Sequence, residues 1–176
     1  MTISLLKSPT EGDWWEVKRR ALITIGKKPV NPPDSKWKHE ILKARHSPIR
    51  YLQFCFLLED IPYWVSVHLC RHIHAQPYVS SQRKDWENSY NRDEEPQGAL
   101  VTMILDMNAE ELMAIANKRL CNRASKKTQS VVQQMCLIAL DSCPELAGLL
   151  VPMCEYHGGK CKEMYSCSKK MWREDD

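Results

Sequence analysis

Apolar and polar positions along the chain predict both helices and strands. Apolar residues recur every three or four positions over several stretches, a spacing that places them on one face of a helix. The predicted helices cover residues 13–25, 34–45, 63–72, 98–105, 108–120, 123–142 and 144–153. The continuous apolar run at 51–59 has the length of a buried strand, and Pro77 favours extended backbone over 77–83. We therefore expect the strands in the first half and a second half that is nearly all helical.

Local signals indicate where several of these elements begin. The segment 27–34 holds three prolines, which exclude regular structure, so it separates the first two helices. Pro62 suits the first turn of the helix that follows the strand. Asn108 and Glu111 have the spacing of an N-cap and the third helical residue, as in a capping box with Asn in place of Ser or Thr.

Length and composition limit the class of protein. The chain has 176 residues, 43% of them hydrophobic, which is enough for one core that buries about two-thirds of the unfolded surface. No apolar run approaches the roughly 20 residues that span a bilayer, so we expect a cytoplasmic protein without membrane association. The 25 basic and 22 acidic residues give a net charge of +3, too even for a protein that wraps nucleic acid. Any anionic ligand would therefore need a local arginine cluster.

The chain contains eight cysteines, a number that raises the question of disulfides. Free cysteine behaves as a small hydrophobic residue in apolar or helical surroundings. Five of the eight have such surroundings: Cys55, Cys70, Cys121, Cys136 and Cys143. We expect these five to be reduced thiols.

The strongest candidate for ligand binding is the segment 71–83, in which Arg71 and Arg83 flank a short turn with serine hydroxyls. An arginine fork binds phosphate through two parallel hydrogen bonds. A solvated basic turn is nevertheless the commoner explanation for an isolated arginine pair. The surrounding sequence therefore has to decide between the two interpretations.

That surrounding sequence resembles the flavin-dependent thymidylate synthases of the ThyX type. This family carries Arg-His-Arg, seven further residues, then Ser, one residue and Arg, and the chain has Arg71-His72-Ile73, seven residues, Ser81, Gln82 and Arg83. Matching features upstream are Ser47-Pro48, the apolar run around Phe54-Cys55-Phe56, and Pro62. Matching features downstream are Arg92, Pro96, Asn108-Ala109, Arg119 and Ala124. The resemblance covers about residues 15–150 as an ordered set of weak motifs.

The resemblance implies an α+β fold, with a small antiparallel sheet packed against helices and a helical C-terminal half. It also implies an enzyme that methylates dUMP to dTMP, with methylenetetrahydrofolate as carbon donor, FAD as hydride carrier and NADPH as reductant. No enzyme cysteine attacks the substrate in such a reaction. Hydride transfer is the chemistry of the cofactor, so the protein positions two flat rings and stabilises developing negative charge.

Site residues follow from the resemblance position by position. The substrate-binding residues would be Arg71, Ser81, Arg83 and Arg92, with Arg92 reaching dUMP from a neighbouring subunit of a homotetramer. The residues facing the flavin would be Ser47, His72, Asn108 and Arg119. Arg119 would also be catalytic, because it would polarise the pyrimidine carbonyl. His68, in contrast, is taken as a structural histidine on an apolar helix.

The sequence also departs from the family pattern. Ile73 replaces the second arginine of the motif, Val79 stands where the family has Glu, Arg50 where it has an acid, and Arg123 where it has His. The gap between Arg83 and Arg92 is shorter than in typical members. Two alternatives stay open beside the synthase: a related enzyme that adds another group, such as hydroxymethyl, to a deoxypyrimidine nucleotide, and a nucleotide-binding or metal-binding protein on the same scaffold.

A cysteine-rich tail follows the region of resemblance. We divide the chain into a ThyX-like domain at 1–153 and a tail at 154–176, in which Cys154, His157, Cys161 and Cys167 supply four nitrogen and sulfur donors. Four such donors are the ligand set of a structural zinc site. Their spacing of two, three and five intervening residues is irregular for zinc, so a loosely ordered tail is the alternative.

Overall fold

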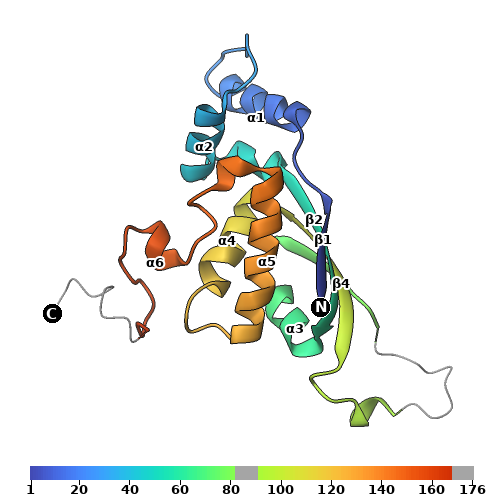
Figure 1. The fold of residues 1–176 in the computed structure, drawn as a ribbon. Helices are drawn as coiled ribbons and strands as arrows, with labels where there is room; N and C mark the ends of the chain where they lie inside the picture. The colour runs from blue at the N-terminus through green and yellow to red at the C-terminus, as the bar shows by residue number, and fades with distance from the viewer. Residues whose placement is uncertain (82–90, 168–176) are drawn as a thin grey trace.

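A computed structural model describes residues 1–81 and 91–167, and the side chain of Arg92 lies outside the description. Four strands form one antiparallel sheet (Figure 1). Its order is β1 (Thr2–Lys7), β2 (Gln53–Pro62), β4 (Leu100–Asn108) and β3 (Ala75–Val79). With helices packed on this small sheet, the predicted α+β class is confirmed.

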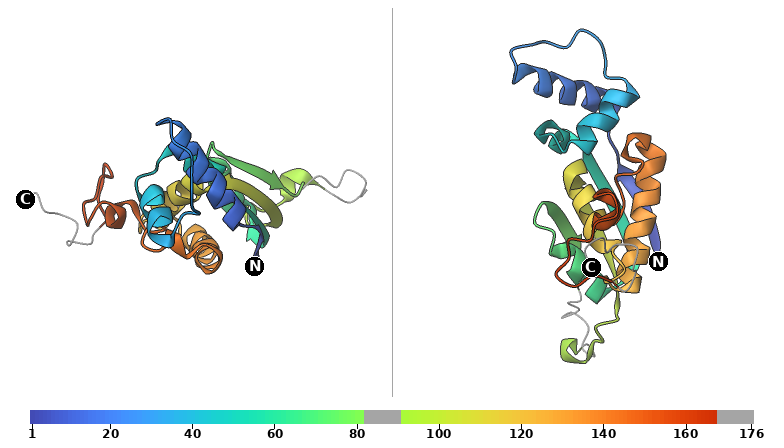
Figure 2. Two further views of the ribbon diagram at one scale, coloured as in Figure 1. Left: turned by 90° about the horizontal axis from the view of Figure 1, so that it is seen from above. Right: turned by 90° about the vertical axis from the view of Figure 1, so that its left-hand side faces the viewer.

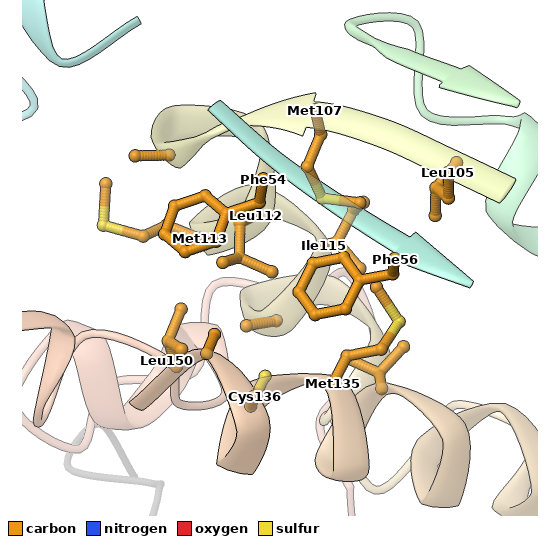
Figure 3. Packing of buried hydrophobic residues seen from close by; sticks show 14 of the residues in the cluster. Phe54, Phe56, Leu105, Met107, Leu112, Met113, Ile115, Met135, Cys136 and Leu150 are labelled. Atoms are coloured by element: carbon orange, nitrogen blue, oxygen red, sulfur yellow. The ribbon is translucent and has the colours of Figure 1, made fainter. Parts of the chain in front are cut away.

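The two central strands carry the core because their side chains alternate between two faces. Phe54 and Phe56 of β2 are buried, as are Leu105 and Met107 of β4. Phe56 pairs with Leu105 and Phe54 with Met107, so the inward side chains of both strands lie beside one another. Figure 3 shows the two phenylalanine rings pointing from β2 toward the helices.

Three helices bury the inner face of the sheet. They are α3 (Tyr63–Cys70), α4 (Ala109–Arg119) and α5 (Lys126–Ser142). Leu112 and Ile115 of α4 and Met135 of α5 meet the strand side chains in a single cluster (Figure 3). Helix α4 begins directly after β4, where Asn108 accepts a hydrogen bond from the Glu111 amide at 2.9 Å and caps the helix as the sequence predicts.

The remaining helices lie around this core. Helices α1 (Glu11–Ile23) and α2 (Ser35–Lys43) occupy one end of the molecule, and η2 (Arg92–Glu94) lies at the opposite end (Figure 2). Two further 3₁₀ helices, η1 (Ser47–Tyr51) and η3 (Pro144–Leu146), and the short α6 (Met153–Tyr156) complete the chain. None of the helices in the described ranges is long and apolar enough to cross a membrane.

The structure corrects three predicted elements. Residues 98–105, predicted as helix, belong mainly to strand β4, in which buried and less buried residues alternate. Strand β1 was not predicted, because Thr2–Lys7 shows no clear period on its own and is defined by its pairing with β2. The helix predicted at 144–153 is only the 3₁₀ turn η3 followed by irregular backbone. All eight cysteines are free thiols in the structure, including the five expected to be reduced.

Candidate functional site

A cavity of 260 Å³ opens at the C-terminal end of α4. Basic side chains dominate its lining, which consists of Arg71, His72, Lys118, Arg119, Cys121, Arg123, Ala124 and Glu163. The cavity forms where three segments meet: the turn after α3, the end of α4 and the tail. The first part of the motif, Arg71-His72, and the separate downstream residue Arg119 therefore lie in one site.

Arg119 is held in place by two hydrogen bonds. Its Nε donates to His72 Nε2 at 3.0 Å, and one terminal nitrogen donates to the His68 carbonyl oxygen at 2.7 Å. The Nε2 atom accepts only when His72 is neutral and carries its proton on Nδ1. The Nδ1 atom lies 3.1 Å from Glu111 Oε1, so it donates to that carboxylate. Both contacts are satisfied together by the tautomer of His72 that carries its proton on Nδ1.

Glu111 is the buried end of this chain of contacts. The side chains of His72 and Glu111 are 11% and 7% exposed, so the carboxylate and the imidazole hold each other away from water. Glu111 and Arg119 are eight residues apart on α4, which places them on the same face of the helix. His72 bridges them from the turn after α3. We call Glu111, His72 and Arg119 the relay.

Positively charged side chains outnumber negatively charged ones in the cavity lining. Burial, and then the like charge of Arg71, lowers the pKa of Arg119. The single acid of the lining, Glu163, is engaged with Lys118 at 2.8 Å. Within the described part of the chain, no hydrogen bond or ion pair involves the Arg71 guanidinium. Positive groups concentrated in this way favour an anionic ligand.

The same positive charges act on His68, which lies near the end of α3. Burial, and then the charges of Arg119 and Arg71, lowers the pKa of its imidazole. The ring is fixed by a contact of 2.9 Å between Nδ1 and Thr128 Oγ1 of α5 and by edge-on packing against Trp64. The prediction of a structural His68 therefore describes its ring well, but its backbone carbonyl orients Arg119.

The other predicted residues lie elsewhere. Ser47 begins η1, which packs at the N-terminal end of α4 near Asn108, where Arg50 and Glu110 form an ion pair at 2.5 Å. This end is separated from Arg119 by the length of α4. Ser81 follows β3 and does not line the cavity. Arg83 falls outside the described residues, and of Arg92 only the backbone position at the start of η2 is described.

Several lining or bridging residues were not predicted as site residues. Glu111 was assigned only to the helix cap, although its spacing of eight residues from Arg119 was visible in the sequence. Lys118 and Cys121 lie next to Arg119 in the sequence, and for this reason they line the same cavity. Glu163 comes from the tail, so no local signal indicated that it would reach α4.

The four predicted metal donors do not stay together. Cys154, Cys161 and Cys167 line a small cavity of 30 Å³ together with Cys121, whereas His157 does not. The ring of His157 packs edge-on against Tyr156 instead. Over residues 1–81 and 91–167, no group of three or more His, Cys, Asp or Glu side chains is already placed to hold a metal ion.

The sheet covered on one face by α3, α4 and α5 is the fold of the flavin-dependent thymidylate synthases. Two structures of thymidylate synthase X from Helicobacter pylori, each described with FAD and dUMP, match with TM-scores of 0.63. Each match has 14% sequence identity and covers 81% of this chain and 99% of the other. Neither the protein-family models nor the curated proteins give a match. At this identity the likeness establishes a common fold.

Proposed function

We propose that the chain binds dUMP, or a closely related deoxypyrimidine nucleotide, and methylates it as a flavin-dependent thymidylate synthase. The cationic cavity carries the proposal, because Arg71 and the relay meet there on the fold of enzymes whose structures contain FAD and dUMP. Methylenetetrahydrofolate would be the carbon donor and NADPH the reductant.

The cavity residues fit an anionic pyrimidine nucleotide. The Arg71 guanidinium is suited to bind the phosphate, because an arginine fork matches two phosphate oxygens. Arg119, fixed by His72 and the His68 carbonyl, is suited to stabilise negative charge that develops on the pyrimidine carbonyl. Donors that are already oriented do this without reorganising during the reaction.

Flavin would bind beyond the cavity itself. The volume of 260 Å³ is below the range of about 300–1,000 Å³ typical of small-molecule sites, so it does not hold a nucleotide and FAD together. When bound, reduced FAD would supply the hydride. Ser47 and Asn108, at the far end of α4, are the proposed flavin contacts, together with His72 and Arg119. A site of this extent fits a homotetramer in which Arg92 reaches the nucleotide of a neighbouring subunit, while Ser81 and Arg83 join Arg71 as proposed dUMP contacts.

The relay gives the sharpest test of the proposal. Arg119→Lys keeps a positive charge but removes the fork that contacts both His72 and the His68 carbonyl. We expect it to lower kcat/KM for conversion of dUMP to dTMP by about 100-fold or more, the usual loss when one preorganised donor is removed. Arg19→Lys on exposed α1 is the matched control and should keep full activity.

Binding measurements separate the synthase from the alternatives. Calorimetric titration of the purified chain with dUMP, in the presence and absence of FAD, should show binding of both. A chain that binds dUMP but neither binds FAD nor forms product would instead be a nucleotide-binding protein on this fold. The exposed Ile73 in place of a motif arginine is the observation that favours this second candidate. Failure to bind dUMP would exclude both.

A further inference from the structure

Four cysteines surround one small cavity beside the proposed active site. They are Cys121, Cys154, Cys161 and Cys167, and the cavity between them has a volume of 30 Å³. Cys121 follows α4, whereas the other three belong to α6 and the tail, so residues far apart in the sequence meet here. All four are free thiols. The active-site chemistry proposed above uses none of them.

Specific contacts hold the tail against the loop after α4. Lys118 pairs with Glu163 at 2.8 Å, and Arg123 donates to the Tyr165 carbonyl oxygen at 3.3 Å. Beside the cavity itself, the Asn122 amide nitrogen lies 4.0 Å from Cys167 Sγ. These contacts bring the tail cysteines beside Cys121 in the loop after α4.

The size and chemistry of the cavity select one kind of occupant. Four thiolates in a tetrahedral arrangement are the ligand set of structural zinc or of an iron–sulfur cluster. The cavity of 30 Å³ is about two to three times the space that a single water molecule needs, which suits a single ion rather than a cluster of several irons and sulfides.

We propose that Cys121, Cys154, Cys161 and Cys167 form a four-thiolate zinc site that fastens the tail to the loop after α4. This set exchanges His157 of the sequence-based prediction for Cys121. Among residues 1–81 and 91–167, no group of side chains is already placed to hold a metal ion. The four sulfurs must therefore move to within about 2.3 Å of the ion as it binds. Such coupling between metal binding and local ordering is usual for structural zinc.

The site has a consequence for the cationic cavity. Cys121, Arg123 and Glu163 line both cavities, so they form a shared wall. Zinc on one side of this wall would fix the loop that carries Arg123 and the end of α4 that carries Arg119. The proposal does not depend on the nucleotide chemistry, because its readout is metal content.

Metal analysis of the purified full-length protein tests the proposal. We expect about one zinc per chain in the wild type, as a single four-ligand site requires. His157→Ala should keep this zinc, whereas Cys121→Ser and Cys161→Ser should each lose it. Cys70→Ser is the matched control: this exposed thiol at the end of α3 lies outside the cavity, and its removal should leave the zinc content unchanged.

Cobalt substitution gives an independent measure on the unaltered chain. Replacing zinc by Co²⁺ should produce the absorption of tetrahedral four-thiolate coordination, so the result stands even if a serine variant fails to fold. Retention of zinc in Cys121→Ser with its loss in His157→Ala would overturn the proposed ligand set. A brown iron-containing protein, a disulfide among the four thiols, or a wild type that binds no zinc on titration would overturn the site.

Discussion

Arg119 occupies a half-buried position at the end of α4, where a second arginine stands close enough to lower its pKa. Holding a charged guanidinium in a half-buried place costs free energy unless other groups compensate the charge. The relay provides this compensation through His72 and the buried Glu111 carboxylate. Among the described residues, Glu111 makes its contact with His72, which in turn contacts Arg119. The residue that stabilises the arginine geometry is therefore one that need not touch a ligand.

Glu111→Gln should weaken dUMP binding by about tenfold, because the neutral amide no longer fixes the Nδ1 tautomer of His72 as strongly as the carboxylate does. Calorimetric titration measures the change, and thermal unfolding confirms that the variant is folded. Glu110→Gln, which alters a neighbouring carboxylate paired with Arg50, is the control and should bind dUMP normally. Equal affinity of the Glu111 variant and the wild type would show that the relay has no role in binding.

Ile73 is the residue at which the motif departs most from the flavin-dependent family. It is 86% exposed, so a longer side chain fits there without disturbing the core. We expect the wild type to bind FAD weakly, and Ile73→Arg to bind it about ten- to a hundredfold more tightly through one added charge-assisted contact. Equilibrium titration with FAD measures this. Ile73→Gln is the control for size without charge, and a gain of similar size in that variant would refute the electrostatic explanation.

Part of this site was predictable from the residues and part was not. The sequence placed Arg71, His72 and Arg119 among the site residues, and these three line one cavity, while their binding roles stay predictions. It did not indicate the contact of His72 with Glu111, because that contact depends on how the side chains of two separate elements point toward each other. The contribution of Glu163 was equally hidden, since it depends on where the tail docks.

At the scale of elements, α4 connects the two ends of the proposed site. Asn108 caps its first turn and Arg119 ends it, so the position of the helix sets the distance between the proposed flavin and nucleotide contacts. Its start was predictable, because a cap is a local signal. Strand β4 immediately before it was taken for a helix, and only its pairing with β2 and β3 fixes it as a central strand.

Asn108 has both a structural and a proposed cofactor role, and two substitutions separate them. Asn108→Ala should lower the free energy of unfolding by about 1 kcal/mol, the usual cost of losing an N-cap. Asn108→Asp keeps an oxygen acceptor for the Glu111 amide and should retain stability. Denaturant unfolding measures both. If Asn108→Asp is stable yet binds FAD less well than the wild type, the cofactor contact is supported; unchanged FAD affinity would leave the residue as a cap alone.

At the scale of the whole molecule, the outer face of the sheet is the notable surface. Leu57, Ile104 and Tyr78 are in register across β2, β4 and β3, and they alternate with the core residues of these strands, which places them on the outer face. Tyr78 is 58% exposed, so this apolar row ends in a large ring open to solvent. An exposed aromatic ring at the end of an apolar row suits a contact with another protein chain. The small volume of the cationic cavity also fits a site completed by another subunit.

The chain should therefore assemble as a homotetramer, with a mass in light scattering of four times the 20.5 kDa of one chain. Tyr78→Lys places a charge in the apolar row and should shift the protein toward smaller species. It should also weaken dUMP binding, because Arg92 of a neighbouring subunit is expected to reach the nucleotide. Leu137→Lys is the matched control, since Leu137 is 57% exposed on α5 and lies away from the sheet's outer face.

A wild-type protein that stays monomeric at tens of micromolar, an ordinary working range for weak assembly, would contradict the shared site. A Tyr78→Lys variant that is monomeric yet binds dUMP with wild-type affinity would show instead that each chain binds the nucleotide by itself.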